Sequence, residues 1–462
     1  QARRFTCKVK TMEQVNQLRR MGLFDAKVPR YTSYPPATKF SNDVAGPDFS
    51  GWIETIQPGA KISLYLHVPF CRRLCWFCAC RTQGTSSLGP VAAYLETVKQ
   101  EIALLGETLP EGVTLSQLHW GGGTPTLLSA SMIADLTASA RAAAPFAEDM
   151  EFSVEIDPNE VDESRLDALA EAGMTRASIG VQDFDPEIQK IIGREQSFEI
   201  TAAAVEGLRA RGVTSLNADI LYGLPNQSRA KITESVQKLL SLSPDRVALY
   251  GYAHVPWMAR RQTLIPSDAL PTPEERLHLF ETARRLFMWD GYDEVGIDHF
   301  ARHEDKMAVA ARDGTLRRNF QGYTVDDGVA LIGLGASAIS RFPQGYAQNR
   351  PGTGDYTRAI REGGFATGRG HAFAGEDLMR ARLIEQLMCQ FRTDRAELER
   401  DYGASAAHLD AMFEDVAERF GRFVTRDADG LAIRSDGRPL ARMIARAFDE
   451  YAVDQAGHSP AV

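Results

Sequence analysis

Four of the six cysteines in this chain lie within ten residues, in the run CRRLCWFCAC at residues 71–80. Cys71, Cys75 and Cys78 follow the spacing C-x-x-x-C-x-x-C. Three thiolates this close together can bind three irons of a four-iron cluster and leave the fourth iron open to another ligand. A cluster with an open iron can carry out chemistry as well as store electrons. The spacing therefore predicts a [4Fe-4S] centre with Cys71, Cys75 and Cys78 as its ligands.

A tetrahedral zinc site is the main alternative for these cysteines. Zinc sites usually combine two separated ligand pairs, whereas the remaining cysteines, Cys7 and Cys389, are isolated, and Cys389 is predicted to be a core residue. A disulfide framework is not expected in a chain of 462 residues with six cysteines. Since oxygen damages exposed clusters, we expect anaerobic or microaerobic chemistry.

Length and charge limit the classes of protein that the chain can belong to. Its 462 residues are enough for two or three domains. The net charge of -9 and the pI of about 5.6 argue against a nucleic-acid partner. The sequence contains no apolar stretch of membrane-spanning length and nothing like a secretory signal, so we expect no membrane insertion and a reducing, cytoplasmic location. Residues 1–11 are predicted to be a basic extension outside the fold.

The elements that must position the cysteines alternate between strands and helices. Strands are predicted where apolar residues alternate, over residues 62–68, 113–120, 151–157, 175–181, 214–223 and 245–251. Helical patterns lie between them, for example at 92–106 and 163–173. Such alternation indicates a parallel sheet, and a single series of about six units favours a barrel or partial barrel over an open sheet.

Polar and glycine residues follow several of these strands. Cys71 follows the first strand and the run GGGT (121–124) the second, Glu155 and Asp219 lie near the ends of the third and fifth, and Gln182 follows the fourth. Right-handed crossovers place the carboxyl ends of all these strands on one face, which predicts a single site there. Taken singly, the glycines fit an ordinary tight turn and each acid fits a buried structural carboxylate.

The pattern changes beyond about residue 370. Residues 376–391 are predicted to form a strongly amphipathic helix, followed by further helices and short strands. Their order resembles a winged-helix module. A DNA-binding role is not predicted for it, because the chain is acidic.

Taken together, the motifs resemble those of the radical S-adenosylmethionine (SAM) enzymes, and in particular the oxygen-independent coproporphyrinogen III oxidases. The resemblance extends from residue 29 almost to the C-terminus. It is carried by PRYTSYP (29–35), HVPFC, HWGGGTPT (119–126), EIDPNE (155–160), GVQDF (180–184), GREQ (193–196), DILYGLP (219–225), YAHVP (252–256), DHFAR (298–302), RNFQGYT (318–324), GASAIS (335–340) and YAQN (346–349). Small departures occur at Trp76, Ala79, Gly193 and Trp257.

The resemblance implies an α/β fold, a partial parallel (β/α)6-type radical SAM barrel with a mainly α-helical C-terminal domain. The domains expected are an N-terminal extension and lid segment (1–60), the barrel with its C-terminal extension (61–370) and the helical domain (371–462). The PRYTSYP segment is expected either to fold across the open end of the site as a lid or to pack on the barrel as an anchor.

The resemblance also implies the cofactors, a [4Fe-4S] cluster and two SAM molecules per chain. Carried over position by position, the first SAM would contact Tyr65, Gly122, Glu155 and Ile339. The second would contact Phe77, Gly123, Thr124, Gln182, Arg194, Asp219 and Ala253. Cys80 and Tyr65 are the candidate catalytic residues, and Cys80 is not expected to bind the cluster.

The reaction implied is the oxidative decarboxylation of two propionates of coproporphyrinogen III to vinyl groups, giving protoporphyrinogen IX in haem biosynthesis. A 5′-deoxyadenosyl radical removes a hydrogen atom β to each carboxylate, and carbon dioxide and one electron then leave. An unidentified electron donor and an unidentified acceptor are therefore implied, and we expect a monomer. Arg30, Arg317 and Arg318 are candidates to bind the substrate carboxylates.

Three other functions stay open at this point. Two are those of a radical SAM methyltransferase and of a haem-degrading relative. The third is that of a non-catalytic haem-binding protein on the same fold.

Overall fold

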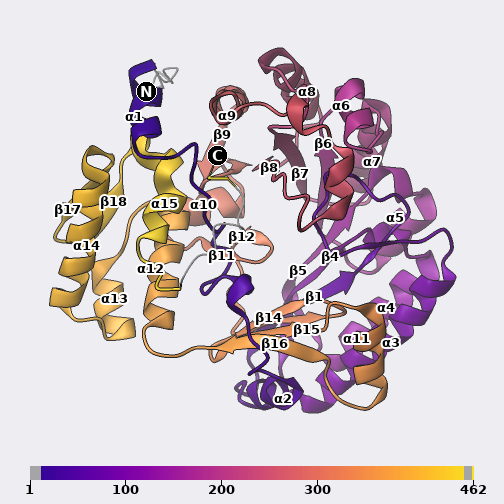
Figure 1. Ribbon diagram of the computed structural model, residues 1–462. Helices are drawn as coiled ribbons and strands as arrows, with labels where there is room; N and C mark the ends of the chain where they lie inside the picture. The colour runs from indigo at the N-terminus through magenta and orange to yellow at the C-terminus, as the bar shows by residue number, and fades with distance from the viewer. Residues whose placement is uncertain (1–11, 452–459, 462) are drawn as a thin grey trace.

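The computed structural model describes residues 12–451, 460 and 461. Its centre is a twelve-stranded sheet in the order β16-β15-β14-β13-β1-β4-β5-β6-β7-β8-β10-β9 (Figure 1). The run from β13 to β8 is parallel throughout. At its two ends, β13 and β8 pair with the antiparallel strands β14 and β10 rather than with each other. The barrel is therefore partial, and the predicted fold class is confirmed.

All six predicted strands are present. The parallel strands are β1 (Lys61–Val68), β4 (Thr114–Gly122), β5 (Phe146–Ile156), β6 (Arg176–Gln182), β7 (Ser215–Tyr222), β8 (Arg246–Gly251) and β13 (Leu331–Leu334). The antiparallel strands of the sheet are β9 (Tyr292–Val295), β10 (His299–Arg302), β14 (Ile339–Phe342), β15 (Gly345–Asn349) and β16 (Thr367–Ala372). The smaller two-stranded sheets pair β2 (Phe70–Cys71) with β3 (Gln83–Gly84), β11 (Arg317–Asn319) with β12 (Gly322–Thr324), and β17 (Val424–Asp427) with β18 (Gly430–Ile433).

Helices cover the outer face of the parallel strands (Figure 1). They are α3 (Gly89–Thr108), α4 (Ala130–Ala143), α5 (Glu163–Glu171), α6 (Pro186–Ile191), α7 (Phe198–Ala210), α8 (Arg229–Ser241) and α9 (Pro273–Trp289), and α10 (Lys306–Asp313) and α11 (Thr353–Arg361) follow later in the chain. The predicted helices at 92–106 and 163–173 correspond to α3 and α5. Serine or aspartate side chains cap several of these helices at their first turn, among them Ser129, Asp162 and Ser228.

Side chains alternate between the two faces of each strand, as the β geometry requires. On β1, Leu64 and Leu66 are buried in the core that β1 shares with the outer helices, whereas Tyr65 and His67 face inward. The neighbouring strands repeat this division, and their inward side chains are polar. Those that line one cavity inside the sheet are Gln117, His119, Glu151, Ser153, Glu155, Arg176, Ser178, Asn217 and Asp219. The interior of the barrel is thus built to hold a polar ligand rather than a sealed apolar core.

The C-terminal unit contains α12 (Asp377–Gln390), α13 (Arg395–Tyr402), α14 (Ala406–Phe420), the β17–β18 hairpin and α15 (Ala441–Arg446). The predicted helix at 376–391 corresponds to α12. A second hydrophobic core lies in this unit, separate from that of the barrel.

The N-terminal segment is divided between these two cores. Helix α1 (Met12–Arg20) and the residues after it contribute Val15, Leu18, Leu23, Phe24, Tyr31 and Tyr34 to the C-terminal core. Helix α2 (Gly46–Glu54) contributes Phe49 and Ile53 to the barrel core. Removal of residues 1–36 would therefore take six buried side chains out of the C-terminal core. The predicted extension over residues 1–11 lies outside the described residues.

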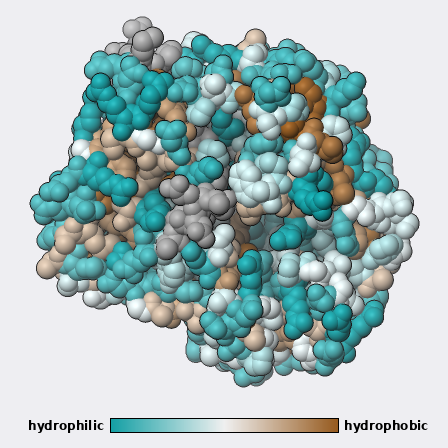
Figure 2. Space-filling view, viewed as in Figure 1, coloured by the Kyte–Doolittle hydropathy of each residue, from teal (hydrophilic) through white to brown (hydrophobic). Residues whose placement is uncertain are grey.

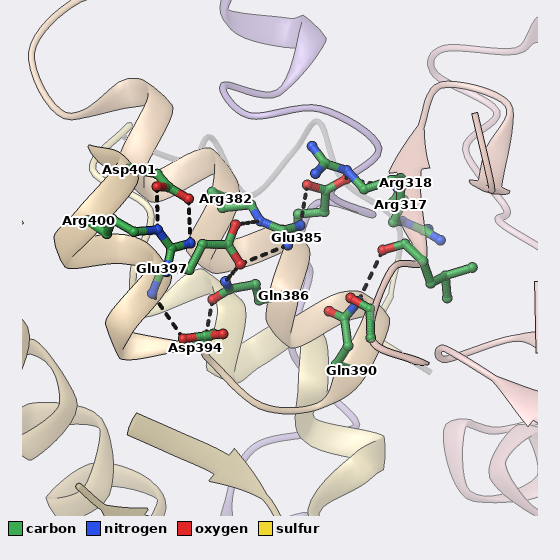
Figure 3. A network of polar contacts seen from close by, with 12 residues as sticks. Arg317, Arg318, Arg382, Glu385, Gln386, Gln390, Asp394, Glu397, Arg400 and Asp401 are labelled. Atoms are coloured by element: carbon green, nitrogen blue, oxygen red, sulfur yellow. Dashed lines mark hydrogen bonds and ion pairs between the residues drawn. The ribbon is translucent and has the colours of Figure 1, made fainter. Parts of the chain in front are cut away.

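A polar network on α12 holds the β11–β12 hairpin (Figure 3). One oxygen of Glu385 accepts hydrogen bonds from Arg317 Nε at 3.1 Å and from the main-chain N–H of Arg318 at 2.9 Å. Arg382 binds both Glu385 and Glu397, which ties the hairpin to α13. Since neighbouring strand residues point to opposite sides, the Arg318 side chain leaves this network and lies over the Tyr323 ring, 4.4 Å from its centroid.

Hydrophilic side chains cover most of the face shown in Figure 2, with smaller hydrophobic areas between them. Within residues 12–451, no helix combines the length and apolar character that crossing a bilayer demands.

Glu101 of α3 connects three separate parts of the chain behind the sheet. It is fully buried and accepts hydrogen bonds from the Gly335 N–H, the Asn349 side-chain amide and the Tyr356 hydroxyl, each at 2.7 Å. Burial raises the pKa of Glu101 to about 7, although these three donors oppose the rise. The carboxylate thus holds the loop after β13 against α3.

We expect Glu101→Gln to change how stability depends on pH. An acid whose pKa is raised by folding contributes stability that is present below its unfolded pKa, near 4.5, and is lost as pH rises to about 7. The free energy of unfolding of the native chain, relative to the variant, should therefore fall on the order of 3 kcal/mol across this window. Urea denaturation of both proteins at pH 5, 6 and 7.5 measures this. A constant difference between them would contradict it.

Candidate active site

The cysteine loop leaves the sheet directly after β1 and is fastened to its neighbours by main-chain hydrogen bonds. Gly123 N–H donates to the Val68 carbonyl and Thr124 N–H to the Phe70 carbonyl, both at 2.8 Å. Further along the loop, Trp76 N–H donates to the carbonyl of Ile192 at 2.9 Å. The loop is therefore held against the end of β4 and against the C-terminal end of α6.

The surroundings of the three predicted ligands suit thiolates. Arg194 Nη1 lies 3.7 Å from Cys75 Sγ, and this cation partly offsets the burial that raises the pKa of Cys75. Burial likewise raises the pKa of Cys71, while a hydrogen bond from Thr124 opposes the rise. A hydrogen bond with Cys80 lowers the pKa of Cys78 and raises that of Cys80, so Cys78 is the thiolate of this pair. The donor set fits an iron–sulfur cluster.

Among the described residues, no three His, Cys, Asp or Glu side chains converge on the position of one metal ion. This does not count against a cluster, because each cysteine of a cubane binds a different iron. The predicted ligand set remains a prediction.

The run of three glycines brings protein groups close to the strand end. A Cβ atom at Gly122 would lie 2.5 Å from the His67 ring, and one at Gly123 would lie 2.5 Å from the Phe70 carbonyl oxygen. Gly122 also has φ +112°, which side chains disfavour. Protein packing alone therefore accounts for these glycines. Contact of Gly122 and Gly123 with a ligand remains a prediction.

Tyr65 of β1 contacts two other side chains that point into the barrel, His67 and His119. Its hydroxyl lies 2.9 Å from His67 Nδ1, and its ring stacks on that of His119 at 5.6 Å. Burial lowers the pKa of His67 and raises that of Tyr65 far above its usual value, so both side chains stay neutral. Ile339 is brought near Tyr65 by β13, since Gly333 pairs with Tyr65 and a Cβ on it would lie 2.5 Å from the Ile339 carbonyl oxygen.

Glu155 and Asp219 face the same cavity of about 230 Å³. Burial alone would raise the pKa of Glu155, but hydrogen bonds from His119 and the Gly122 N–H hold it below its usual value. Asp219 accepts a hydrogen bond from Asn217 at 2.9 Å, but burial, helped by the charge of Glu155, raises its pKa to about 6. Near pH 6, Glu155 is therefore ionised whereas Asp219 is partly protonated, although both face the same cavity.

Arg194 and Gln182 lie together at the end of β6. Arg194 Nη2 donates to the Gly180 carbonyl at 2.9 Å and Nη1 lies 3.5 Å from an Asp157 carboxylate oxygen. Within the described part of the chain, its buried Nε has no hydrogen-bond partner. Gln182 has φ +68°, an unfavourable conformation for a residue other than glycine. Such conformations occur often at functional sites, which supports Gln182 as a ligand contact.

Phe77 and Ala253 are joined by a residue that the sequence interpretation missed. The Gln262 side-chain amide donates to the Phe77 carbonyl at 2.7 Å and to the Ala253 carbonyl at 3.1 Å. Its neighbour Arg261 donates to the Cys80 carbonyl at 3.2 Å. Both residues lie in a short 3₁₀ helix (Arg260–Leu264) after YAHVP, where nothing in the local pattern marks them. His119, Tyr250 and His299, which line the smaller cavity, were also missed.

Two of the departures from the family motifs touch each other. They are Trp76 and Gly193. A Cβ atom on Gly193 would lie 3.0 Å from the Trp76 indole, and Gly193 has φ +67°. The indole therefore occupies the space that a side chain at residue 193 would need.

Among the three arginines proposed for substrate binding, Arg317 is already committed to a partner. It forms an ion pair with Glu385 at 3.1 Å, so the structure gives it a role in holding the hairpin. Arg30 and Arg318 lie together, with Arg318 Nη2 donating to the Arg30 carbonyl at 3.3 Å and Arg30 Nη2 to the Gly251 carbonyl at 3.0 Å.

The chain is similar to known proteins over most of its length. Residues 65–239 match the model of the radical SAM superfamily. The chain is 63% identical over 451 residues to an oxygen-independent coproporphyrinogen III oxidase from Paracoccus denitrificans, covering 98% of this chain and 100% of that protein. It is 38% identical over 425 residues to the protein of the same name from Escherichia coli, covering 92% and 93%. A solved structure, described as coproporphyrinogen III oxidase (HemN) from Escherichia coli, a radical SAM enzyme, matches with a TM-score of 0.88 and 36% identity, over 92% of this chain and 100% of that one.

Proposed function

The chain belongs to the oxygen-independent coproporphyrinogen III oxidases, a family of radical SAM enzymes, and we propose that it carries out the family's reaction with two SAM molecules in one site. It is an oxidoreductase of haem biosynthesis that converts two propionates of coproporphyrinogen III to vinyl groups and forms protoporphyrinogen IX. The observation that carries this conclusion is the extent of the match, since relatives of this name align with 92–98% of the chain and not only with the radical SAM segment.

Cys71, Cys75 and Cys78 are the residues that we assign to the cluster. When bound, the [4Fe-4S] cluster supplies the electron that cleaves SAM into methionine and a 5′-deoxyadenosyl radical. Arg194 stabilises the thiolate of Cys75 by its charge, and Thr124 orients Cys71 by a hydrogen bond. The position of Cys80, beside Cys78 but exposed, supports a role other than that of a ligand.

The two proposed SAM sites share the face at the strand ends. One would be bordered by Tyr65, Gly122, Glu155 and Ile339. The other would be bordered by Phe77, Gly123, Thr124, Gln182, Arg194, Asp219 and Ala253. The Gln262 bridge supports the second site, because it sets the spacing between Phe77 and Ala253. The unpartnered Nε of Arg194, among the described atoms, suits a SAM carboxylate.

Tyr65 and Cys80 are proposed as catalytic residues. Because the pKa of Tyr65 is raised by burial, its hydroxyl stays protonated and can donate a hydrogen bond to a bound ligand. The thiol of Cys80 likewise keeps its proton, and it lies at the exposed side of the cysteine loop. Both groups can therefore hold a proton close to the reacting molecules.

The remaining parts of the assignment are also proposals. We propose a monomer with the barrel at 61–370 and the helical domain at 371–462, which the two separate cores support. An electron donor and an acceptor of the electron released at each decarboxylation are required by the stoichiometry. The oxygen-sensitive thiolate ligands support a reducing, cytoplasmic location.

An anaerobic assay with dithionite, SAM and coproporphyrinogen III tests the function. We expect two molecules of carbon dioxide and two of 5′-deoxyadenosine for each protoporphyrinogen IX formed, and no product when SAM is left out. A methylated porphyrin would instead indicate a methyltransferase. Opening of the macrocycle would indicate a haem-degrading enzyme, and binding without turnover a haem-binding protein.

A further inference from the structure

The loop that follows β8 exposes three large apolar side chains within a short stretch, residues 257–264. Trp257, Met258 and Leu264 are 56%, 62% and 57% exposed. Of the eight large apolar side chains that the described residues expose, three therefore lie in this one segment. Scattered apolar residues are normal on a protein surface, whereas a group of them is typical of an interaction site.

Buried neighbours fix the 257–264 segment in this orientation. Val255, Gln262 and Ile265 are almost fully buried. The Val255 N–H donates to the side-chain oxygen of Gln262 at 2.6 Å, and Ile265 belongs to one small core with Ile188 of α6. Since the inner side of the segment is already packed, its exposed apolar side chains have no room to turn inward.

The inner side of the segment lies directly against the cysteine loop. Arg261 donates to the Cys80 carbonyl at 3.2 Å and to the Thr82 hydroxyl at 2.9 Å. The Gln262 amide donates to the Phe77 carbonyl at 2.7 Å. A protein that docks on the outer side is thus separated from the proposed thiolate ligands by little more than this segment. Because electron transfer slows steeply with distance, this position suits a partner that delivers electrons.

The surface around the segment is positively charged, although the whole chain has a net charge of -9. Residues 71–82 and 252–267 contain five arginines and no aspartate or glutamate. Lys27 adds a cation, since its Nζ lies 5.6 Å from the centroid of the Trp257 ring. A carboxylate oxygen of Glu160 lies 3.8 Å from one of the arginines, Arg72. A partner with an acidic surface therefore complements this region. The five arginines are Arg72, Arg73, Arg81, Arg260 and Arg261.

We propose that the 257–264 segment and the arginines around it bind the electron donor, a protein with an acidic surface that carries one electron at a time. This inference rests on the proposed function, which requires a donor. The donor is oxidised by one electron for each SAM molecule that is cleaved to methionine and the 5′-deoxyadenosyl radical. Aromatic, methionine and arginine side chains are enriched at protein interfaces, and a few of them carry most of the binding energy.

The test compares a protein donor with a small one, using the cluster-containing full chain. Reduced flavodoxin, a small acidic FMN protein, is the protein donor, and dithionite is the donor that needs no docking surface. Arg260→Glu should raise the flavodoxin concentration for half-maximal SAM cleavage by about fivefold or more, because a favourable charge is reversed. The double variant Met258→Ser, Leu264→Ser should raise it about tenfold, because apolar contacts are lost. With dithionite, both proteins should cleave SAM as the native chain does.

Trp289→Ser and Arg419→Glu are the matched controls. Trp289 is 94% exposed at the end of α9, and Arg419 is exposed on α14 of the C-terminal unit. Both variants should react with flavodoxin and with dithionite as the native chain does. Higher ionic strength should weaken the flavodoxin reaction of the native chain, and should do so less in Arg260→Glu, because salt screens exposed charges.

Unchanged flavodoxin kinetics in Arg260→Glu and in the double variant overturn the docking site, and so does a native chain that neither binds flavodoxin nor accepts its electrons. An equal loss with dithionite also overturns it, because the damage then lies in the cluster. A native dimer that the double variant dissociates, measured by sedimentation, assigns the surface to a second copy of the chain instead. If the native chain does not cleave SAM with dithionite, the proposed function fails, and calorimetric binding of oxidised flavodoxin to the same variants still decides the site.

Discussion

Cys75→Ala protein, reconstituted anaerobically, should contain almost no iron–sulfur cluster and should not cleave SAM. Cys75 is the most buried of the three proposed ligands, and the charge of Arg194 lies beside its sulfur. Loss of one of three thiolates leaves an iron without a protein ligand, and the cluster is then not retained. Native protein should hold about four irons and four sulfides per chain, as a cubane requires. Iron and sulfide analysis, together with 5′-deoxyadenosine formation under dithionite, measures both effects.

Cys80→Ala is the matched control, because Cys80 lies two residues from Cys78 and is exposed. It should keep the cluster and the iron content of the native chain while porphyrinogen turnover falls. An iron loss in Cys80→Ala as large as that in Cys75→Ala would show that the proposed ligand set is wrong.

Equilibrium binding of SAM to the native chain should saturate near two molecules, and Asp219→Ala should weaken one of them by about 5- to 150-fold. This range corresponds to leaving a buried polar partner unsatisfied, on the order of 1–3 kcal/mol. Asp219 is suited to contact a ligand, since it faces the smaller cavity and burial has raised its pKa to about 6. Clean saturation at one SAM in the native chain would discard the two-site proposal.

Asp219 also predicts that the affinity of the native chain for the SAM molecule at this site depends on pH. A ligand that binds ionised Asp219 must displace a proton below pH 6, so its affinity should fall roughly tenfold per pH unit there and stay level above pH 7. Asp219→Asn should remove this dependence. Asp183→Asn serves as the control, because Asp183 is a buried acid bonded to Ser235 and Gln227 and does not line the cavity. A pH slope that persists in Asp219→Asn would exclude Asp219 as its source.

Short-range patterns in the sequence were sufficient to predict much of this architecture. Six of the seven parallel strands, and the helices between them, follow from apolar residues at periods of two and 3.6, which short windows of the sequence display. The cysteine spacing is local too, since three ligands of one cluster lie within eight residues, from Cys71 to Cys78. The meeting of Cys71, Glu155 and Asp219 at one edge follows from topology, because parallel strands with right-handed connections end on the same face.

Contacts between distant segments were decided only by the tertiary structure. Arg194 meets Cys75 across 119 residues, and Gln262 reaches Phe77 across 185 residues. Residues before position 35 complete the core of a domain that begins near position 377. Such contacts leave no periodic trace in the sequence, because each depends on one side chain meeting another whose position is set by the whole fold.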